Sequence, residues 1–240
     1  MSKKILWLYH DLLDLYGDMG NLLAIEYRLK TAGVEYEIIK QSISDQPDFS
    51  SVDMVYIGSG RFGYLTEAAK HFVKYKDDIL TAIEKGTVFL ITGSSIYLLG
   101  NGMTDLEGNS YEGIGIIDIF GRDTNNMYIS DLVFTPNLEG EAGKQLGYGF
   151  INTTTRYTGS LSAPLFRVHT GGPPCDDGVV TEGFVKNNLF ATFCQGPLLA
   201  KNPHLLKEIL CRLCGEMLCY DDSLETKALE LTVSDMGFNN

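Results

Sequence analysis

The chain has 240 residues, of which 44% are hydrophobic and 21% are charged. These values predict one large α/β domain or two small ones, and they exclude an intrinsically disordered protein. The formal net charge of −12 argues against nucleic acid as a partner, because a phosphate backbone would be repelled by an acidic surface. No stretch approaches the roughly 18 apolar residues that a membrane span needs.

The N-terminus and the cysteines favour a cytoplasmic protein. The apolar run that starts at Ile5 is interrupted at residues 9–11, so it is shorter than the apolar core of a signal peptide. Five cysteines, an odd number, predict free thiols in a reducing compartment. Cys211 and Cys214 lie in a periodic apolar segment, which favours buried core positions over a metal or redox site. We therefore expect no metal and no cofactor.

Strands and helices alternate through the first half of the chain. This alternation predicts a mostly parallel sheet with helices on both faces, and apolar runs such as 54–57 suit strands that are buried on both sides. The expected strands are 5–9, 34–40, 52–57 and 87–92, and the expected helices are 21–32 and 65–84.

The second half reads as a series of short strands with turns rich in Gly, Asn, Pro and Thr. We interpret it as a β-rich addition to the same sheet, because no linker marks a domain boundary. A helix at 203–217 follows, so we expect a single domain over 1–220 and a peripheral helix or loose acidic tail over 221–240. The expected short strands are 114–119, 127–134, 164–168, 181–185 and 189–193.

A buried strand meets a tight turn at Thr92, Gly93, Ser94 and Ser95, and an apolar segment follows at once. In α/β enzymes such a strand–turn–helix corner often raises a nucleophile above the edge of the sheet. The corner contains threonine, glycine and serine, and no cysteine lies between residues 1 and 174. The interpretation of the candidate site depends mainly on this lack of a cysteine.

Three glycines with dinucleotide-binding spacing, Gly58, Gly60 and Gly63, lie between an expected strand and an expected helix. That fingerprint also needs an acidic residue at the end of the next strand, and the strand that ends at Thr92 offers none. A nest of backbone N–H groups that holds an oxyanion or a carboxylate fits better, and a plain tight turn is the alternative. The residues of this nest would be Gly58, Ser59, Gly60 and Arg61.

None of the four histidines lies in a recognisable Ser-His-Asp or Cys-His arrangement. We expect a structural or solvated role for each histidine, and His10 and His169, which end expected strands, are the candidates for a cleft. Cys194 and Gln195 close another strand. Because neighbours on a strand alternate between its two sides, a Gln195 that faces a cleft would put Cys194 in the core.

Three segments carry a family resemblance: Leu12–Asn21 with its Leu-Tyr-Gly-Asp-x-Gly-Asn pattern, Thr181–Val185, and Gly196–Pro203. With these motifs the chain resembles, over about residues 5–218, the glutaminase subunits of lipid II isoglutaminyl synthase, which are class I glutamine amidotransferases of the cobyric acid synthase type. The resemblance implies a flavodoxin-like α/β fold.

The resemblance also implies a mechanism. In active members a cysteine at the strand–turn–helix corner attacks the side-chain amide of glutamine, a glycine-rich loop holds the oxyanion, and a histidine carries the proton. The ammonia passes to a Mur-ligase-like synthetase, which uses ATP to amidate the D-glutamate of the peptidoglycan stem peptide. The family's glycine loop corresponds to residues 58–61 of this chain.

The chain departs from the family pattern at both catalytic positions. Aligning the shared residues 98–100 puts the nucleophile at Gly93, and one inserted residue moves it to Thr92. The histidine that precedes Gly196 in the family is Gln195 here. A glutamate and a histidine of many members correspond to Ile151 and Thr153.

These replacements predict a non-hydrolytic member of the family, because an unassisted hydroxyl is essentially never ionised and a glutamine side chain cannot accept a proton. Such a protein would bind glutamine, another small amide or amino acid, or no ligand, and would act as a structural or regulatory partner of the synthetase. One alternative is an active glutaminase or other amidohydrolase that uses Ser94 or Ser95 with a displaced base such as His10 or His169. Another is nucleotide binding at the glycine loop.

Overall fold

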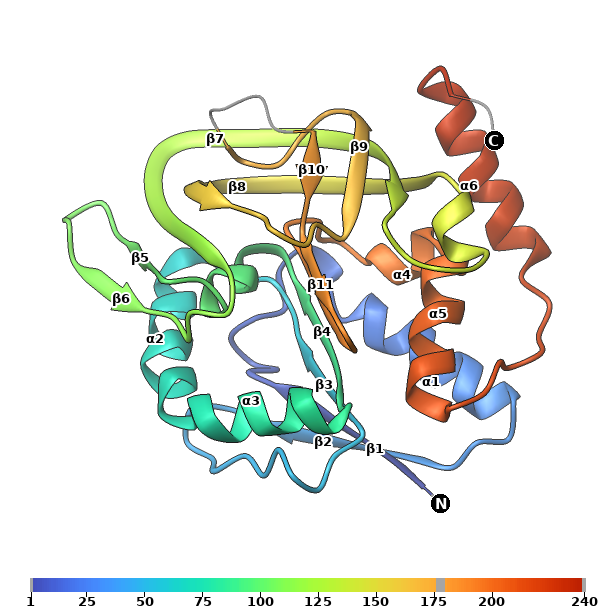
Figure 1. The fold of residues 1–240 in the computed structure, drawn as a ribbon, viewed down its shortest axis with the longest axis horizontal. Helices are drawn as coiled ribbons and strands as arrows, with labels where there is room; N and C mark the ends of the chain where they lie inside the picture. The colour runs from blue at the N-terminus through green and yellow to red at the C-terminus, as the bar shows by residue number, and fades with distance from the viewer. Residues whose placement is uncertain (1, 176–179, 239–240) are drawn as a thin grey trace.

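The computed structural model describes residues 2–175 and 180–238, and two sheets organise the molecule (Figure 1). The first sheet has the strand order β11-β12-β4-β3-β1-β2, and every pairing is parallel except that of β11 with β12. All residues of β3 and β4 are buried, as their unbroken apolar sequences predict. The strands are β1 (Lys3–Leu8), β2 (Tyr36–Gln41), β3 (Met54–Ile57), β4 (Val88–Thr92), β11 (Phe184–Lys186) and β12 (Leu189–Thr192).

Helices cover both faces of this sheet, as the alternating pattern predicts. Figure 1 shows α2 and α3 on one side, and α1 and α5 on the other. The expected helix over 65–84 is two helices, because a short 3₁₀ turn, η2 (Val73–Tyr75), separates them. Among the described residues, no helix is both long and apolar enough to span a bilayer. The helices are α1 (Gly20–Thr31), α2 (Phe62–Phe72), α3 (Lys76–Lys85), α4 (Leu198–Lys201) and α5 (Pro203–Cys214).

The expectation that the β-rich second half joins the same sheet is wrong for all but β11 and β12. The other strands form a second sheet, ordered β10-β9-β7-β5-β6, with β8 beside β7. Its long strands carry hydroxyl and amide side chains at 124–126 and 152–155, which suit a sheet with one wet face and not the buried centre of a parallel sheet. The strands are β5 (Gly102–Thr104), β6 (Ser110–Glu112), β7 (Asp118–Pro136), β8 (Gly147–Ser160), β9 (Phe166–Thr170) and β10 (Thr181–Glu182).

Aromatic side chains join the two sheets into one hydrophobic core. The ring of Tyr157 on β8 stacks on Phe193, which follows β12, at 5.0 Å between centroids, and Tyr97 packs on the same Phe193 ring at 5.6 Å. Stacking of aromatic rings stabilises such contacts beyond simple burial. The second sheet is thereby held against the carboxyl ends of β4 and β12, where the candidate corner lies.

The acidic C-terminal segment forms a peripheral helix, α6 (Ser223–Asp235). Arg28 on α1 anchors its start: one guanidinium nitrogen donates to the Asp221 carbonyl at 3.1 Å, and another pairs with the Glu225 carboxylate. Further along, Leu229 and Val233 pack against Val133 of β7. Helix α6 therefore contacts both the parallel-sheet layer and the second sheet.

Replacing Arg28 by alanine is expected to loosen α6 while the rest of the fold stays intact. The guanidinium is nearly buried but Glu225 is partly exposed, so we expect a loss of about 1–2 kcal/mol in the free energy of unfolding. Limited proteolysis should cut between Gly215 and Asp222 faster than in the wild type. The exposed neighbour Lys30 provides the control, and equal cleavage rates for Arg28→Ala and Lys30→Ala would contradict the anchoring role.

Candidate functional site

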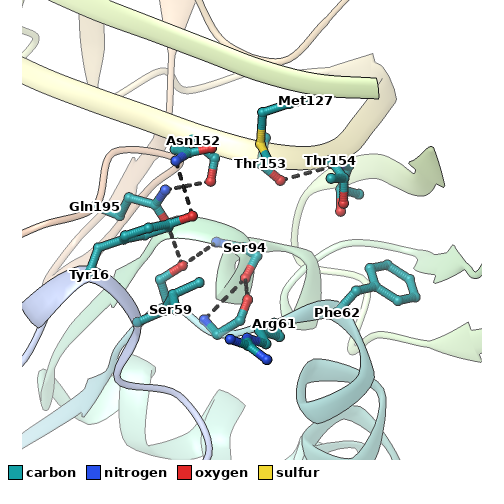
Figure 2. A pocket seen from close by; sticks show the side chains of 13 residues that line it. Tyr16, Ser59, Arg61, Phe62, Ser94, Met127, Asn152, Thr153, Thr154 and Gln195 are labelled. Atoms are coloured by element: carbon teal, nitrogen blue, oxygen red, sulfur yellow. Dashed lines mark hydrogen bonds between the residues drawn. The ribbon is translucent and has the colours of Figure 1, made fainter. Parts of the chain in front are cut away.

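A pocket of about 330 Å³ lies where the turns that follow β3 and β4 meet the strand β8 (Figure 2). Its wall comes from residues 59–62, the turn at Ser94, the β8 residues 152–155, Gln195 beyond β12, and the side chains of Leu15, Tyr16 and Met127. Hydroxyl and amide side chains lie among apolar ones in this wall. Arg61 is the only formally charged side chain among the described residues that line the pocket.

The candidate nucleophile positions, Thr92 and Gly93, lie at the corner between β4 and the 3₁₀ helix η3 (Gly93–Leu98). Their backbone conformations differ. Thr92 is still extended, with φ −119° and ψ 152°, and its buried hydroxyl donates to the Asp18 carboxylate. Gly93 has φ +61°, in the left-handed region that favours glycine. The chain turns sharply at Gly93, and its N–H donates to the Cys194 carbonyl at 3.0 Å.

The serines of this corner bond to the glycine loop. The Ser94 hydroxyl donates to the Gly60 carbonyl at 2.8 Å and accepts from the Gly60 N–H at 3.3 Å. The Ser95 hydroxyl is buried and donates to the Gly58 carbonyl. Of these two rival nucleophiles, only Ser94 lines the pocket.

The glycines of the loop make room for another segment of the same chain. A Cβ atom on Gly58 would lie 2.5 Å from the Leu13 carbonyl oxygen, and one on Gly60 would lie 2.3 Å from the Leu13 side chain. The N–H groups of Ser59 and Gly60 already have side-chain acceptors, Asp18 and Ser94. The Gly-x-Gly spacing is thus explained by close packing on Leu13, without a dinucleotide.

One buried carboxylate, that of Asp18, connects the parts of the site. Its Oδ2 accepts from the Ser59 N–H at 2.8 Å and from the Thr92 hydroxyl, and its Oδ1 accepts from the Gly196 N–H at 3.1 Å and from Asn21 Nδ2 at 3.0 Å. The four donors come from the N-terminal motif, the glycine loop, the corner and the turn after Gln195. Burial raises the pKa of Asp18 to about 6, and the bonds from Thr92, Ser59 and Gly196 act in the opposite direction.

Gln195 is held in the pocket wall by hydrogen bonds at both ends of its amide. Its Oε1 accepts from the Ser59 hydroxyl at 2.6 Å, and its Nε2 donates to the Asn152 carbonyl at 2.6 Å (Figure 2). The Tyr16 hydroxyl accepts from Asn152 Nδ2 at 3.0 Å, which ties the N-terminal loop to β8. Cys194 is fully buried on the other side, as the alternation along the strand predicts, and burial raises the pKa of its thiol.

None of the chain's four histidines lines the pocket. The two cleft candidates lie outside the pocket: His10 packs edge-on against Trp7, and His169 shares a hydrogen bond of 2.7 Å with Thr135 on the second sheet. Within the described ranges, no cluster of three or more His, Cys, Asp or Glu side chains is arranged to hold a metal ion.

Of the two β8 positions that correspond to family residues, Thr153 lines the pocket and Ile151 is buried. The sequence interpretation gave no structural role to Asp18, Asn152 or Tyr16. For Asp18 a signal existed, because it lies inside the Leu-Tyr-Gly-Asp-x-Gly-Asn motif. No comparable signal marks Asn152, since β8 was not expected as a strand.

Two curated relatives are similar to most of the chain. The Staphylococcus aureus lipid II isoglutaminyl synthase (glutamine-hydrolyzing) subunit GatD is 28% identical over 215 residues, which cover 87% of this chain and 84% of the relative. The Streptococcus pneumoniae subunit of the same name is 28% identical over 204 residues, which cover 84% and 76%.

Two solved structures share the fold at low sequence identity. PurLQS from Thermotoga maritima superposes with a TM-score of 0.53 at 14% identity, covering 97% of this chain and 100% of that one. The Trypanosoma brucei CTPS glutaminase domain with bound acivicin gives a TM-score of 0.55 at 10% identity, covering 92% and 97%. The model of the CobB/CobQ-like glutamine amidotransferase domain matches residues 4–203, and the chain therefore belongs to that family.

Proposed function

We propose that this protein is a non-hydrolytic amidotransferase-like subunit of a cytoplasmic synthetase that amidates the D-glutamate of lipid II. The curated relatives are subunits of lipid II isoglutaminyl synthase, which supports the assignment to this process. The observation that supports the non-hydrolytic part is the pair Gly93 and Gln195. Gly93 forms the turn after β4, and the neutral amide of Gln195 lies in the pocket wall at the position that the family resemblance gives to the proton carrier.

Among the described residues, the side chains that line the pocket supply no nucleophile with its base. The Thr92 hydroxyl does donate to the Asp18 carboxylate, but Thr92 is fully buried and does not line the pocket. A hydroxyl must lose its proton to attack an amide, and the acceptor must lie within hydrogen-bond reach. The Ser94 hydroxyl donates to a backbone carbonyl, which is not a usable base, and no histidine lines the pocket. The Asp18 carboxylate accepts from four other donors and does not bond to Ser94.

The pocket itself remains suited to a small polar ligand. Its amide and hydroxyl groups match the hydrogen-bonding groups of glutamine or a related amide, and Arg61 offers a positive charge to a carboxylate. We propose that such a ligand binds without being cleaved. Binding would then serve assembly or regulation.

We propose a Mur-ligase-like synthetase as the partner, with residues 1–220 forming the domain that docks on it. Because the subunit would release no ammonia, the synthetase would take free ammonia from solution. The nitrogen source of the amidated product is therefore the property that separates this function from that of a glutaminase.

The test is amidation of lipid II by the protein together with the Mur-ligase-like synthetase of the same organism and ATP. Two reactions supply either ¹⁵N-ammonium or glutamine labelled with ¹⁵N at its side-chain amide, and mass spectrometry measures the label in the product. We expect label from ammonium alone. Transfer of the glutamine label would overturn the proposal, and the Staphylococcus aureus relative with its own synthetase serves as the control for glutamine-dependent transfer.

A further inference from the structure

We propose that Ser59 excludes any side chain from residue 93, the position that the family resemblance gives to the nucleophile. This inference rests on the proposed function, since it asks why the turn carries glycine. Ser59 belongs to the glycine loop, and the inference gives it no role in attacking an amide. It predicts that restoring a cysteine and a histidine is insufficient to restore the site.

The steric evidence is direct. A Cβ atom on Gly93 would lie 2.2 Å from the Ser59 hydroxyl oxygen, 2.4 Å from the Ser59 Cβ and 3.1 Å from Gln195 Oε1. Non-bonded carbon atoms reach their optimal separation at roughly 3.5–4.0 Å. The Ser59 side chain therefore already fills the volume that the first side-chain atoms of a nucleophile would need.

Rotation of the Ser59 side chain cannot relieve this overlap. The Cβ of a residue is fixed by its backbone, and the Ser59 Cβ is itself within 2.4 Å of the added atom. The backbone is held in turn, because the Ser59 N–H donates to the buried Asp18 carboxylate at 2.8 Å. The hydroxyl donates to Gln195 at 2.6 Å and accepts weakly from the Ser94 N–H at 3.4 Å.

The same contacts describe how Ser59 and Gln195 interact. The Ser59 hydroxyl lies beside Gly93 and donates a hydrogen bond to Gln195 Oε1. Neither group ionises under ordinary conditions, so this pair binds and orients without transferring a proton. The three residues Ser59, Gly93 and Gln195 thus fit one another as a set, and changing Gly93 and Gln195 without Ser59 leaves a steric mismatch.

The first test measures access to a thiol at residue 93. We compare the double variant Gly93→Cys/Gln195→His with the triple variant that also carries Ser59→Gly, both folded, using iodoacetamide and peptide mass spectrometry. Alkylation at residue 93 is expected to be at least about tenfold faster in the triple variant, because only that variant lets the side chain enter the pocket. Equal rates would overturn the role of Ser59.

The second test is independent of thiol chemistry. Gly93→Ala and Gly33→Ala both place a Cβ at a positive φ, +61° and +69°, but nothing lies within 4 Å of a Cβ on Gly33. We expect the melting temperature to fall clearly further for Gly93→Ala than for this control. Adding Ser59→Gly to Gly93→Ala should restore the part of the melting temperature that Gly93→Ala loses beyond the Gly33→Ala control. The double-mutant cycle is then non-additive.

These results separate this inference from the proposed function. An additive cycle, or equal losses for the two glycines, would defeat the steric role of Ser59 even if the wild type leaves glutamine intact. Conversely, glutamine hydrolysis by the wild type would defeat the proposed function while the cycle still reports on packing at residue 93.

Discussion

Replacing Asp18 by asparagine is expected to lower the free energy of unfolding by about 3–5 kcal/mol. Both carboxylate oxygens accept hydrogen bonds, from Ser59 and Thr92 on one side and from Asn21 and Gly196 on the other. An asparagine must turn its NH₂ group toward one of these pairs of donors. Two donors would then lose their acceptor in a fully buried place, and urea denaturation followed by circular dichroism measures the cost.

Asp14→Asn is the matched control for this variant. Asp14 lies in the same loop, is only half-buried, and accepts a single bond from the Met19 N–H at 2.7 Å, which an asparagine oxygen can still accept. The free energy of unfolding of Asp14→Asn is expected to fall by less than about 1 kcal/mol. A comparable loss for Asp14→Asn and Asp18→Asn would show that the four convergent bonds at Asp18 do not organise the site.

Replacing Glu182 by glutamine is expected to flatten the dependence of stability on pH. The Glu182 carboxylate is fully buried, accepts from the Thr192 hydroxyl at 2.9 Å and from the Phe193 N–H, and burial raises its pKa to about 7. A raised pKa means that the folded state holds the proton more tightly than the unfolded chain. This contribution is fully present below about pH 4.5 and is lost as the pH rises through about 7.

The difference in the free energy of unfolding between the wild type and Glu182→Gln reports on Glu182 alone. Other titrating groups, Asp18 among them, are present in both proteins. Between pH 4.5 and pH 8 the wild type should lose about 2–3 kcal/mol relative to Glu182→Gln, measured by chemical denaturation at each pH. The exposed Glu139→Gln provides the control and should follow the wild type. Parallel curves for wild type and Glu182→Gln would mean that Glu182 stays ionised in the fold.

The parallel sheet was predictable because its strands carry their own signal. A run such as Met54–Ile57 is apolar at every position, and only a strand covered on both faces buries it all. The second sheet gave no such signal. Residues 124–126 and 152–155 are polar hydroxyl and amide residues that are typical of turns. They belong to long strands because β7 and β8 pair on both sides of a register shift between Asp123 and Tyr128.

The candidate site, like the fold, was predictable only in part. The turn at Gly93 was predictable from a strand followed by small residues. Alternation predicted only that Cys194 and Gln195 point to opposite sides, and not which of them faces the pocket. The role of Asp18 was not predictable, since its donors lie up to 178 residues away from it in the chain. The overlap of Ser59 with the space beside Gly93 was equally hidden, because it depends on how two loops approach in the folded chain.

The central claim is that the amidotransferase fold persists here around a pocket that does not cleave glutamine. The most direct measurement is the release of glutamate and ammonia from glutamine by the purified protein, with the Staphylococcus aureus relative as the positive control. We predict no release above the uncatalysed background for the wild type or for Ser94→Ala. Repeated turnover by the wild type that is lost in Ser94→Ala would contradict the claim and identify Ser94 as the nucleophile.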